Sequence, residues 1–199
     1  MTQNTRAMKK QEEILAKIKQ NIHEKYDMPA FDIAGITYDS KLDKFIEMSK
    51  LVGGDAIVLA EGADINETIR TYYPDAKDIA SNLPEVRIAT INPDDVDSPH
   101  SLNGIELAVI QGELGVAENG CIWIPQNVKE KVIYFIAEYV VIILDKTKIV
   151  NNMHEAYDQI TFNQYGFGIF ISGPSKTADI EQSLVVGAHG AKGVLVILK

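Results

Sequence analysis

Residues 168–190 read GIFISGPSKTADIEQSLVVGAHG, and the apolar run VLVIL follows at residues 194–198. The segments 168–171 and 193–198 are short and almost uninterruptedly apolar, which is typical of strands buried on both faces of a parallel sheet. Between them, small or apolar residues recur at helical spacing: Ile180, Leu184, Gly187 and Ala188. This spacing predicts a helix over 177–188 with one face on the sheet. The whole stretch therefore predicts a right-handed strand–helix–strand unit.

The loop at residues 172–177 would leave the carboxyl end of its strand and open the predicted helix, which is where open α/β sheets place ligands. Backbone N–H groups at a helix start, helped by hydroxyl and ammonium groups, can hold a phosphate or carboxylate. We expect the ligand-binding residues to be Ser172, Gly173, Ser175, Lys176, Thr177 and, at the other helix end, His189. The alternative is an ordinary capped helix, because Asp179 and Glu181 already oppose the positive end of its dipole.

A second candidate site is the segment QGELGVAENG at residues 111–120. Asn119 and Gly120 lie between two β-prone runs and predict a hairpin, because both residues tolerate positive φ. Glu118 would be held beside this turn and partly shielded by Trp123, and a carboxylate so placed can act as an acid, a base or a nucleophile. The alternative is a solvated surface glutamate. The candidate ligand-binding residues of this segment are Gln111, Glu113 and Asn119.

The remainder of the chain alternates helical and strand patterns, which predicts a three-layer α/β fold with a mostly parallel sheet. Asp39 or Ser40, and later Asp64, are the expected helix caps. Helices are predicted at residues 9–26, 40–52, 64–73 and 153–163, and further strands at 56–60, 86–89, 105–110, 121–124 and 140–144. We expect an N-terminal amphipathic arm over residues 1–28 and one α/β domain over residues 29–199.

The composition of the chain argues against several classes of partner and of binding site. The net charge of -9 argues against nucleic-acid binding, because that needs basic groups that release counterions. The one cysteine and the spacing of the four histidines predict no disulfide, zinc or iron–sulfur site in this chain. The longest apolar stretch, residues 132–144, is shorter than the roughly 20 residues of a membrane span. The charged N-terminal segment lacks the apolar core of a secretory signal, so we expect a cytoplasmic protein.

Two segments together resemble one family. Residues 171–181, ISGPSKTADIE, with GAHG at residues 187–190, resemble the C-terminal motif of LUD-domain proteins of the LutC (YkgG) lactate-utilisation type. Residues 115–120, GVAENG, resemble that family's other motif, GIAETG. The similarity extends from about Val86 to the end of the chain. It implies the Rossmann-like α/β/α sandwich of ribose-phosphate isomerase, glucosamine-phosphate deaminase and CoA transferases.

The resemblance also implies a role in oxidising L-lactate to pyruvate beside partner subunits that carry iron–sulfur clusters. Two departures from the family pattern bear on this role. The family's Pro and His are missing from the segment that corresponds to residues 137–140, AEYV. The sequence Glu118-Asn119-Gly120 instead resembles the SENG motif of CoA transferases, whose glutamate forms a thioester.

The leading hypothesis is a cytoplasmic subunit of a lactate-utilisation system that binds a small anion between the segments 111–120 and 172–177. It would dock on iron–sulfur subunits and carry no cofactor of its own. An enzyme that uses Glu118 on an acyl-CoA or a sugar phosphate is the alternative, and a ligand sensor without catalysis is a third hypothesis. The sequence does not fix the oligomeric state, and a homodimer is compatible with it.

Overall fold

The computed structural model describes residues 3–21, 35–161, 166–178, 184–187 and 189–199. The chain divides into two compact units, residues 1–34 and 35–199. The first unit contains α1 (Gln3–Gln20), on which Ile14, Leu15 and Ile18 are each about half exposed. The predicted end of this helix at Tyr26 and the predicted domain boundary after residue 28 lie outside the described residues. No helix within the described ranges has the length and apolarity needed to cross a membrane.

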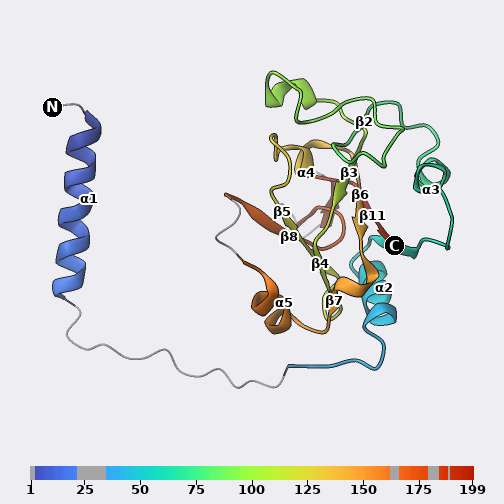
Figure 1. The fold of residues 1–199 in the computed structure, drawn as a ribbon, viewed down its shortest axis with the longest axis horizontal. Coiled ribbons are helices and arrows are strands. Elements are labelled where there is room, and N and C mark those ends of the chain that lie inside the picture. Colours follow the sequence, from blue (N-terminus) through green and yellow to red (C-terminus); the bar gives the residue numbers. More distant parts are fainter. Residues whose placement is uncertain (1–2, 22–34, 162–165, 179–183, 188) are drawn as a thin grey trace. The chain divides into compact units, whose positions relative to one another are not determined.

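The second unit holds the remaining elements (Figure 1). Its helices are α2 (Lys41–Leu51), α3 (Ile65–Tyr72), α4 (Ile133–Ile136) and α5 (Met153–Gln159), with 3-10 turns η1 (Pro99–Leu102) and η2 (Lys146–Lys148). Its strands are β1 (Asp55–Val58), β2 (Ile79–Ala80), β3 (Leu107–Gln111), β4 (Leu114–Val116), β5 (Cys121–Pro125), β6 (Tyr139–Leu144), β7 (Ile149–Val150), β8 (Gly168–Ile171), β9 (Lys176–Ala178), β10 (Leu184–Val186) and β11 (Gly193–Leu198).

A five-stranded, wholly parallel sheet forms the centre of this unit, in the order β1-β11-β6-β3-β2. Its three middle strands, β11, β6 and β3, are the apolar runs predicted at residues 193–198, 140–144 and 105–110. These strands are buried on both faces, which explains why their sequences are continuously apolar. The predicted α/β class, with a mostly parallel central sheet and flanking helices, is confirmed.

The central strand β6 faces two separate hydrophobic cores. Val141 and Ile143 pack on one face of the sheet with Ile69 of α3. Val140, Ile142 and Leu144 pack on the other face with Phe45 of α2 and with residues of β5. All five of these β6 side chains are at most 1% exposed. Burying each stabilises the fold by roughly 1.5–3 kcal/mol relative to an exposed side chain.

A second sheet, which the sequence analysis did not predict, packs on the central one in the order β7-β4-β5-β8. The predicted hairpin forms its centre, with Val116 paired with Cys121 across the turn 117–120. Gly120 adopts a φ of +66°, as the turn requires. The outer face of this sheet packs on α5 through a third core that contains Trp123 and Ala156.

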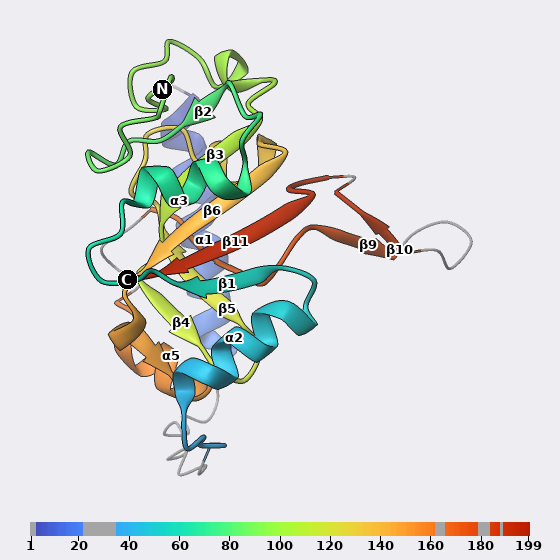
Figure 2. The same ribbon diagram turned by 90° about the vertical axis from the view of Figure 1, so that its right-hand side faces the viewer.

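The C-terminal strand–helix–strand prediction is wrong. β8 pairs antiparallel with β5 in the second sheet, whereas β11 lies in the central sheet. In place of a helix over 177–188, β9 and β10 form a two-stranded antiparallel ribbon. Figure 2 shows this ribbon projecting from the body of the unit. Residues 179–183 and 188 of the predicted helix lie outside the described residues.

Both expected helix caps are confirmed, while one strand prediction is wrong. Ser40 accepts the Asp43 N–H at 3.2 Å, and Asp64 accepts the Asn66 N–H at 2.9 Å. The strand predicted at residues 86–89 is absent from the sheet, where β2 pairs with β3 instead. Val86 is buried against the α3 core from within a turn, so apolar packing and not strand pairing explains its pattern.

Candidate functional site

The two motif segments meet at one end of the second sheet. β5 and β8 pair antiparallel with Ile122 opposite Ile171, so the turn before β5 and the loop after β8 lie side by side. The Ser172 hydroxyl donates to the main-chain oxygen of Asn119 at 2.8 Å. Of the predicted site residues, the structure brings these two into direct contact.

Glu118 is half-buried and holds the start of α5. Its carboxylate accepts the N–H of Met153, the first residue of α5, at 2.7 Å. Its own N–H donates to the Asn151 carbonyl at 3.0 Å. An acceptor at this position satisfies one of the N–H groups that a helix start leaves unpaired. These hydrogen bonds therefore give Glu118 a structural role that needs no catalytic function.

Glu118→Ala should lower the free energy of unfolding by about 1 kcal/mol, because the Met153 N–H loses its acceptor. Glu118→Gln keeps an acceptor oxygen and should lower the free energy of unfolding by clearly less than Glu118→Ala does. Equilibrium urea unfolding of both variants measures the difference. In parallel, mass spectrometry after incubation with acetyl-CoA should find no adduct; an adduct on wild-type protein that Glu118→Gln abolishes would contradict the structural role.

Cys121 lies beside the same contact, and the sequence analysis did not place it there. Burial raises the pKa of its thiol, a hydrogen bond with Ser172 lowers it and the charge of Glu118 raises it further. The net shift is upward, so the thiol stays protonated at neutral pH and is a weak nucleophile. A lone cysteine in a sequence carries no signal for such a contact, because Ser172 is distant along the chain.

A small pocket, here called the Ser175 pocket, lies beside the loop after β8 and has a volume of about 180 Å³. Three predicted site residues, Gly173, Ser175 and His189, line it together with aromatic and aliphatic side chains. The remaining lining residues are Tyr134, Phe135, Val140, Phe170, Ile171, Gly190, Ala191 and Val194. None of these described lining residues is acidic. The wall therefore supplies hydrogen-bond donors for an anion and no carboxylate that would repel it.

The sequence analysis expected the loop 172–177 at the carboxyl edge of the parallel sheet, but the structure places it elsewhere. The Ser175 N–H donates to the Ala191 carbonyl at 2.9 Å, just before β11 begins, so the loop lies at the amino end of that strand. Lys176 donates through Nζ to the Val52 carbonyl at the end of α2. Thr177 lies in β9 and not at the start of a described helix. The predicted helix start is therefore not found among the described residues of this loop, while anion binding by the loop stays a prediction.

Gln111 and Glu113 lie in a different place, at the carboxyl ends of β3 and β6. They line a pocket of about 340 Å³, here called the Gln111 pocket, together with Asp145 and Lys148. Gln111 donates to the Ile143 carbonyl at 2.9 Å, which fixes its amide against β6. Hydrogen bonds from Thr147 hold the pKa of Asp145 below its usual value, so that carboxyl is ionised at neutral pH. This pocket thus presents two carboxylates.

Comparisons with known proteins bear on the family and the fold of this chain. A family model described as the LUD domain matches residues 94–198, just over half of the chain, and includes both motif segments. The chain belongs to the LUD-domain family. The predicted family membership is thereby confirmed.

Curated relatives of this LUD domain include two proteins named Lactate utilization protein C. The protein from Shouchella clausii is 35% identical over 107 residues, which cover 49% of this chain and 46% of the relative. The protein from Geobacillus thermodenitrificans is 34% identical over 88 residues, which cover 39% of this chain and 35% of the relative. The matched stretch therefore spans less than half of each relative.

A solved structure supports the fold of the LUD domain. The crystal structure of a DUF162 family protein from Deinococcus radiodurans superposes with a TM-score of 0.63 at 12% identity. The match covers 82% of this chain and 99% of that protein.

Some residues of the LUD domain's Ser175 pocket were not predicted from sequence. Tyr134 and Phe135 reach it from α4, and their positions depend on tertiary packing that no local pattern shows. Among the described residues, no three His, Cys, Asp or Glu side chains are grouped so that they could hold a metal ion.

Proposed function

We propose that this LUD domain serves a lactate-utilisation system, in which it binds a small carboxylate in the Ser175 pocket. Two relatives named Lactate utilization protein C, at 35% and 34% identity, support the biological role. The family motif that led to this hypothesis contributes Gly173 and Ser175 to the pocket wall.

The observation that carries the proposal is the character of the Ser175 pocket. Its volume of about 180 Å³ lies below the roughly 300–1,000 Å³ of pockets for drug-sized ligands, so it suits a ligand of a few heavy atoms. Ser175 and His189 supply hydrogen-bond donors, and Phe135 and Phe170 supply an apolar wall. A short hydroxy or keto acid has this combination of a carboxylate and an apolar carbon.

The Gln111 pocket fits an anion less well. Glu113 and Asp145 both line it, and Lys148 is the one basic residue among the described residues of its wall. Two carboxylates raise the free energy of a bound anion, since like charges repel over these short distances. Electrostatics therefore favours the Ser175 pocket for lactate or pyruvate.

The proposal includes a cytoplasmic location and docking on partner subunits that carry iron–sulfur clusters. In this arrangement electrons from lactate would pass to the partners, and this chain would supply binding and no redox group. Purifying the tagged protein from its native host grown on lactate should co-isolate proteins that contain iron and acid-labile sulfide. Normal growth on lactate after deletion of the gene would contradict the role.

Calorimetric titration with L-lactate and pyruvate tests the binding step. Lactamide, a neutral analogue of lactate, is the matched ligand control and should not bind. Ser175→Ala and His189→Gln should each weaken carboxylate binding about tenfold, as expected for a lost hydrogen bond to a charged group. His100→Gln removes an exposed histidine in η1 and should leave binding unchanged. Equal affinity for lactamide, or unaltered binding in both pocket variants, would contradict the proposal.

A further inference from the structure

A third cavity lies at the amino ends of β3 and β6 and takes no part in the proposed function. It has a volume of about 350 Å³, and three tyrosines line it: Tyr72, Tyr73 and Tyr139. Three carboxylates share the wall: Asp75, Glu106 and Glu138. None of the described residues in the wall of this tyrosine cavity is basic.

The aromatic part of the cavity is held firmly. The rings of Tyr73 and Tyr139 lie 5.3 Å apart between centroids, tilted by 49°. Tyr139 also lies over Gly193 of the neighbouring strand, where an added Cβ would come within 3.0 Å of its ring. Burial, then the neighbouring Tyr139 and Asp55, raises the pKa of Tyr73 to about 12. Its ring is therefore neutral and electron-rich at any physiological pH.

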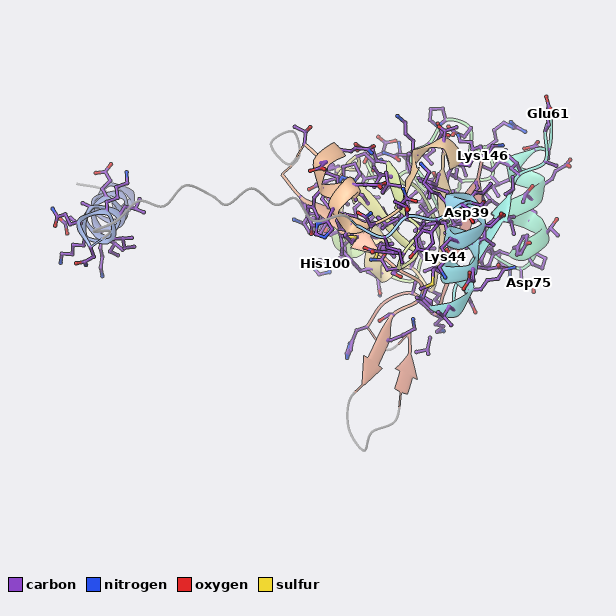
Figure 3. The ribbon with its side chains drawn as sticks, turned by 90° about the horizontal axis from the view of Figure 1, so that it is seen from below. Asp39, Lys44, Glu61, Asp75, His100 and Lys146 are labelled. Atoms are coloured by element: carbon purple, nitrogen blue, oxygen red, sulfur yellow. The ribbon has the colours of Figure 1, made fainter. Side chains whose placement is uncertain are left out.

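The three acidic side chains of the cavity differ in their surroundings. Glu106 accepts the N–H groups of Lys77 and Asp78, which lowers the pKa of its carboxyl. Asp75 is exposed at the surface (Figure 3). Glu138 pairs with Lys192 at 2.9 Å, in an ion pair that is half exposed on both sides.

Among the described residues, three basic side chains lie near the cavity, and two of them bond to residues of its wall. Arg70 donates to the Ala76 carbonyl at 2.5 Å, and Lys192 is held by Glu138. Lys77 lies close enough to lower the pKa of Glu106. Basic groups of the protein itself thus lie beside this acidic and aromatic wall.

We propose that the tyrosine cavity binds a small organic cation, with an alkylammonium group placed between the tyrosine rings and the carboxylates. Cations are attracted to the faces of aromatic rings, and this attraction adds to that of a nearby carboxylate. A cavity of this size holds an alkyl chain of several carbons besides the charged group. An anion would meet three carboxylates here.

The Glu138–Lys192 ion pair predicts how two substitutions should change cation binding. Lys192 neutralises a carboxylate that would otherwise attract the ligand, so Lys192→Gln should strengthen cation binding. Glu138→Gln in the same background should remove that gain. Net charge alone would predict the same pattern, so a control that changes the net charge at another exposed acid, Glu61→Gln, is needed to show that the effect is local.

Binding of n-butylammonium, followed through tyrosine ring signals in NMR spectra, tests the proposal. The neutral analogue n-butanol is the matched ligand control. Asp75→Asn and Tyr139→Leu should each weaken n-butylammonium roughly two- to fivefold, while Lys192→Gln should tighten it by a similar factor. Glu61→Gln changes the net charge equally at another exposed acid and should have no effect (Figure 3).

Two results would overturn the proposal: n-butanol binding as tightly as n-butylammonium, or Asp75→Asn behaving like Glu61→Gln. Circular dichroism of each variant shows whether it remains folded, and the exposed Asp75→Asn change should not affect folding. Lactate binding in the Ser175 pocket is measured separately, so the two proposals can fail independently.

Discussion

Gly173→Ala should lower the free energy of unfolding by about 2–4 kcal/mol, because two costs combine at this position. Gly173 has a φ of +64°, a left-handed conformation that costs an L-residue about 1–2 kcal/mol. An added Cβ would also lie 2.6 Å from the main-chain oxygen of Val52 at the end of α2. That oxygen accepts a hydrogen bond from Lys176, so it cannot move away without losing a partner.

A matched control separates the two costs. Gly62 has a φ of +75°, but an added Cβ there has no described non-adjacent atom within 4 Å. Gly62→Ala should therefore lose only the conformational part, about 1 kcal/mol. Urea unfolding of both variants gives the comparison. Equal losses would mean that the loop after β8 is not packed on α2 as described.

Gly168→Ala should lower the free energy of unfolding by about 1–3 kcal/mol through overpacking alone. The new Cβ would lie 2.2 Å from Cη2 of Trp123. Trp123 is 5% exposed and packs on Phe170 with ring centroids 5.0 Å apart, so its ring has little room to shift. The change would separate β8 from β5 next to both motif segments.

Intrinsic fluorescence can follow this variant, because Trp123 is the single tryptophan of the chain. The emission of folded Gly168→Ala should shift relative to wild type as the ring is displaced. Gly166→Ala is the control: its φ is not left-handed and an added Cβ has no described non-adjacent atom within 4 Å. The control should keep both the emission spectrum and the stability within about 0.5 kcal/mol of wild type. An unshifted spectrum in Gly168→Ala would contradict the tight packing.

The central sheet could be predicted from the sequence because its strands are buried on both faces. Continuous apolar runs as short as those of β6 and β11 are typical of such strands in an α/β chain. The caps Ser40 and Asp64 were predictable because they act through hydrogen bonds within three residues. These signals are local, so no knowledge of the tertiary structure was needed.

The C-terminal ribbon was missed because its apolar spacing suits two structures. Leu184 and Gly187 fit a helical face, but Leu184-Val185-Val186 is also a short β-prone run that pairs with β9. Periodicity alone does not separate these cases over so few residues. Assigning β8 to the second sheet required its pairing with β5, which is a contact distant in sequence.

The candidate site was predictable only in part. Family resemblance identified the two segments that meet at Asn119 and Ser172. Residue chemistry alone could not show that Glu118 accepts the first N–H of α5 or that Gln111 and Glu113 line a separate pocket. Each of these depends on which strand end a side chain occupies, and that is set by sheet order.

The shared strand β6 also restricts how this family can change in length during evolution. Its alternate side chains enter two different cores, so inserting one residue would send each following side chain to the opposite core. Gains and losses of residues among LUD relatives should therefore collect in turns outside the two motif segments, and residues 139–144 should keep a fixed length.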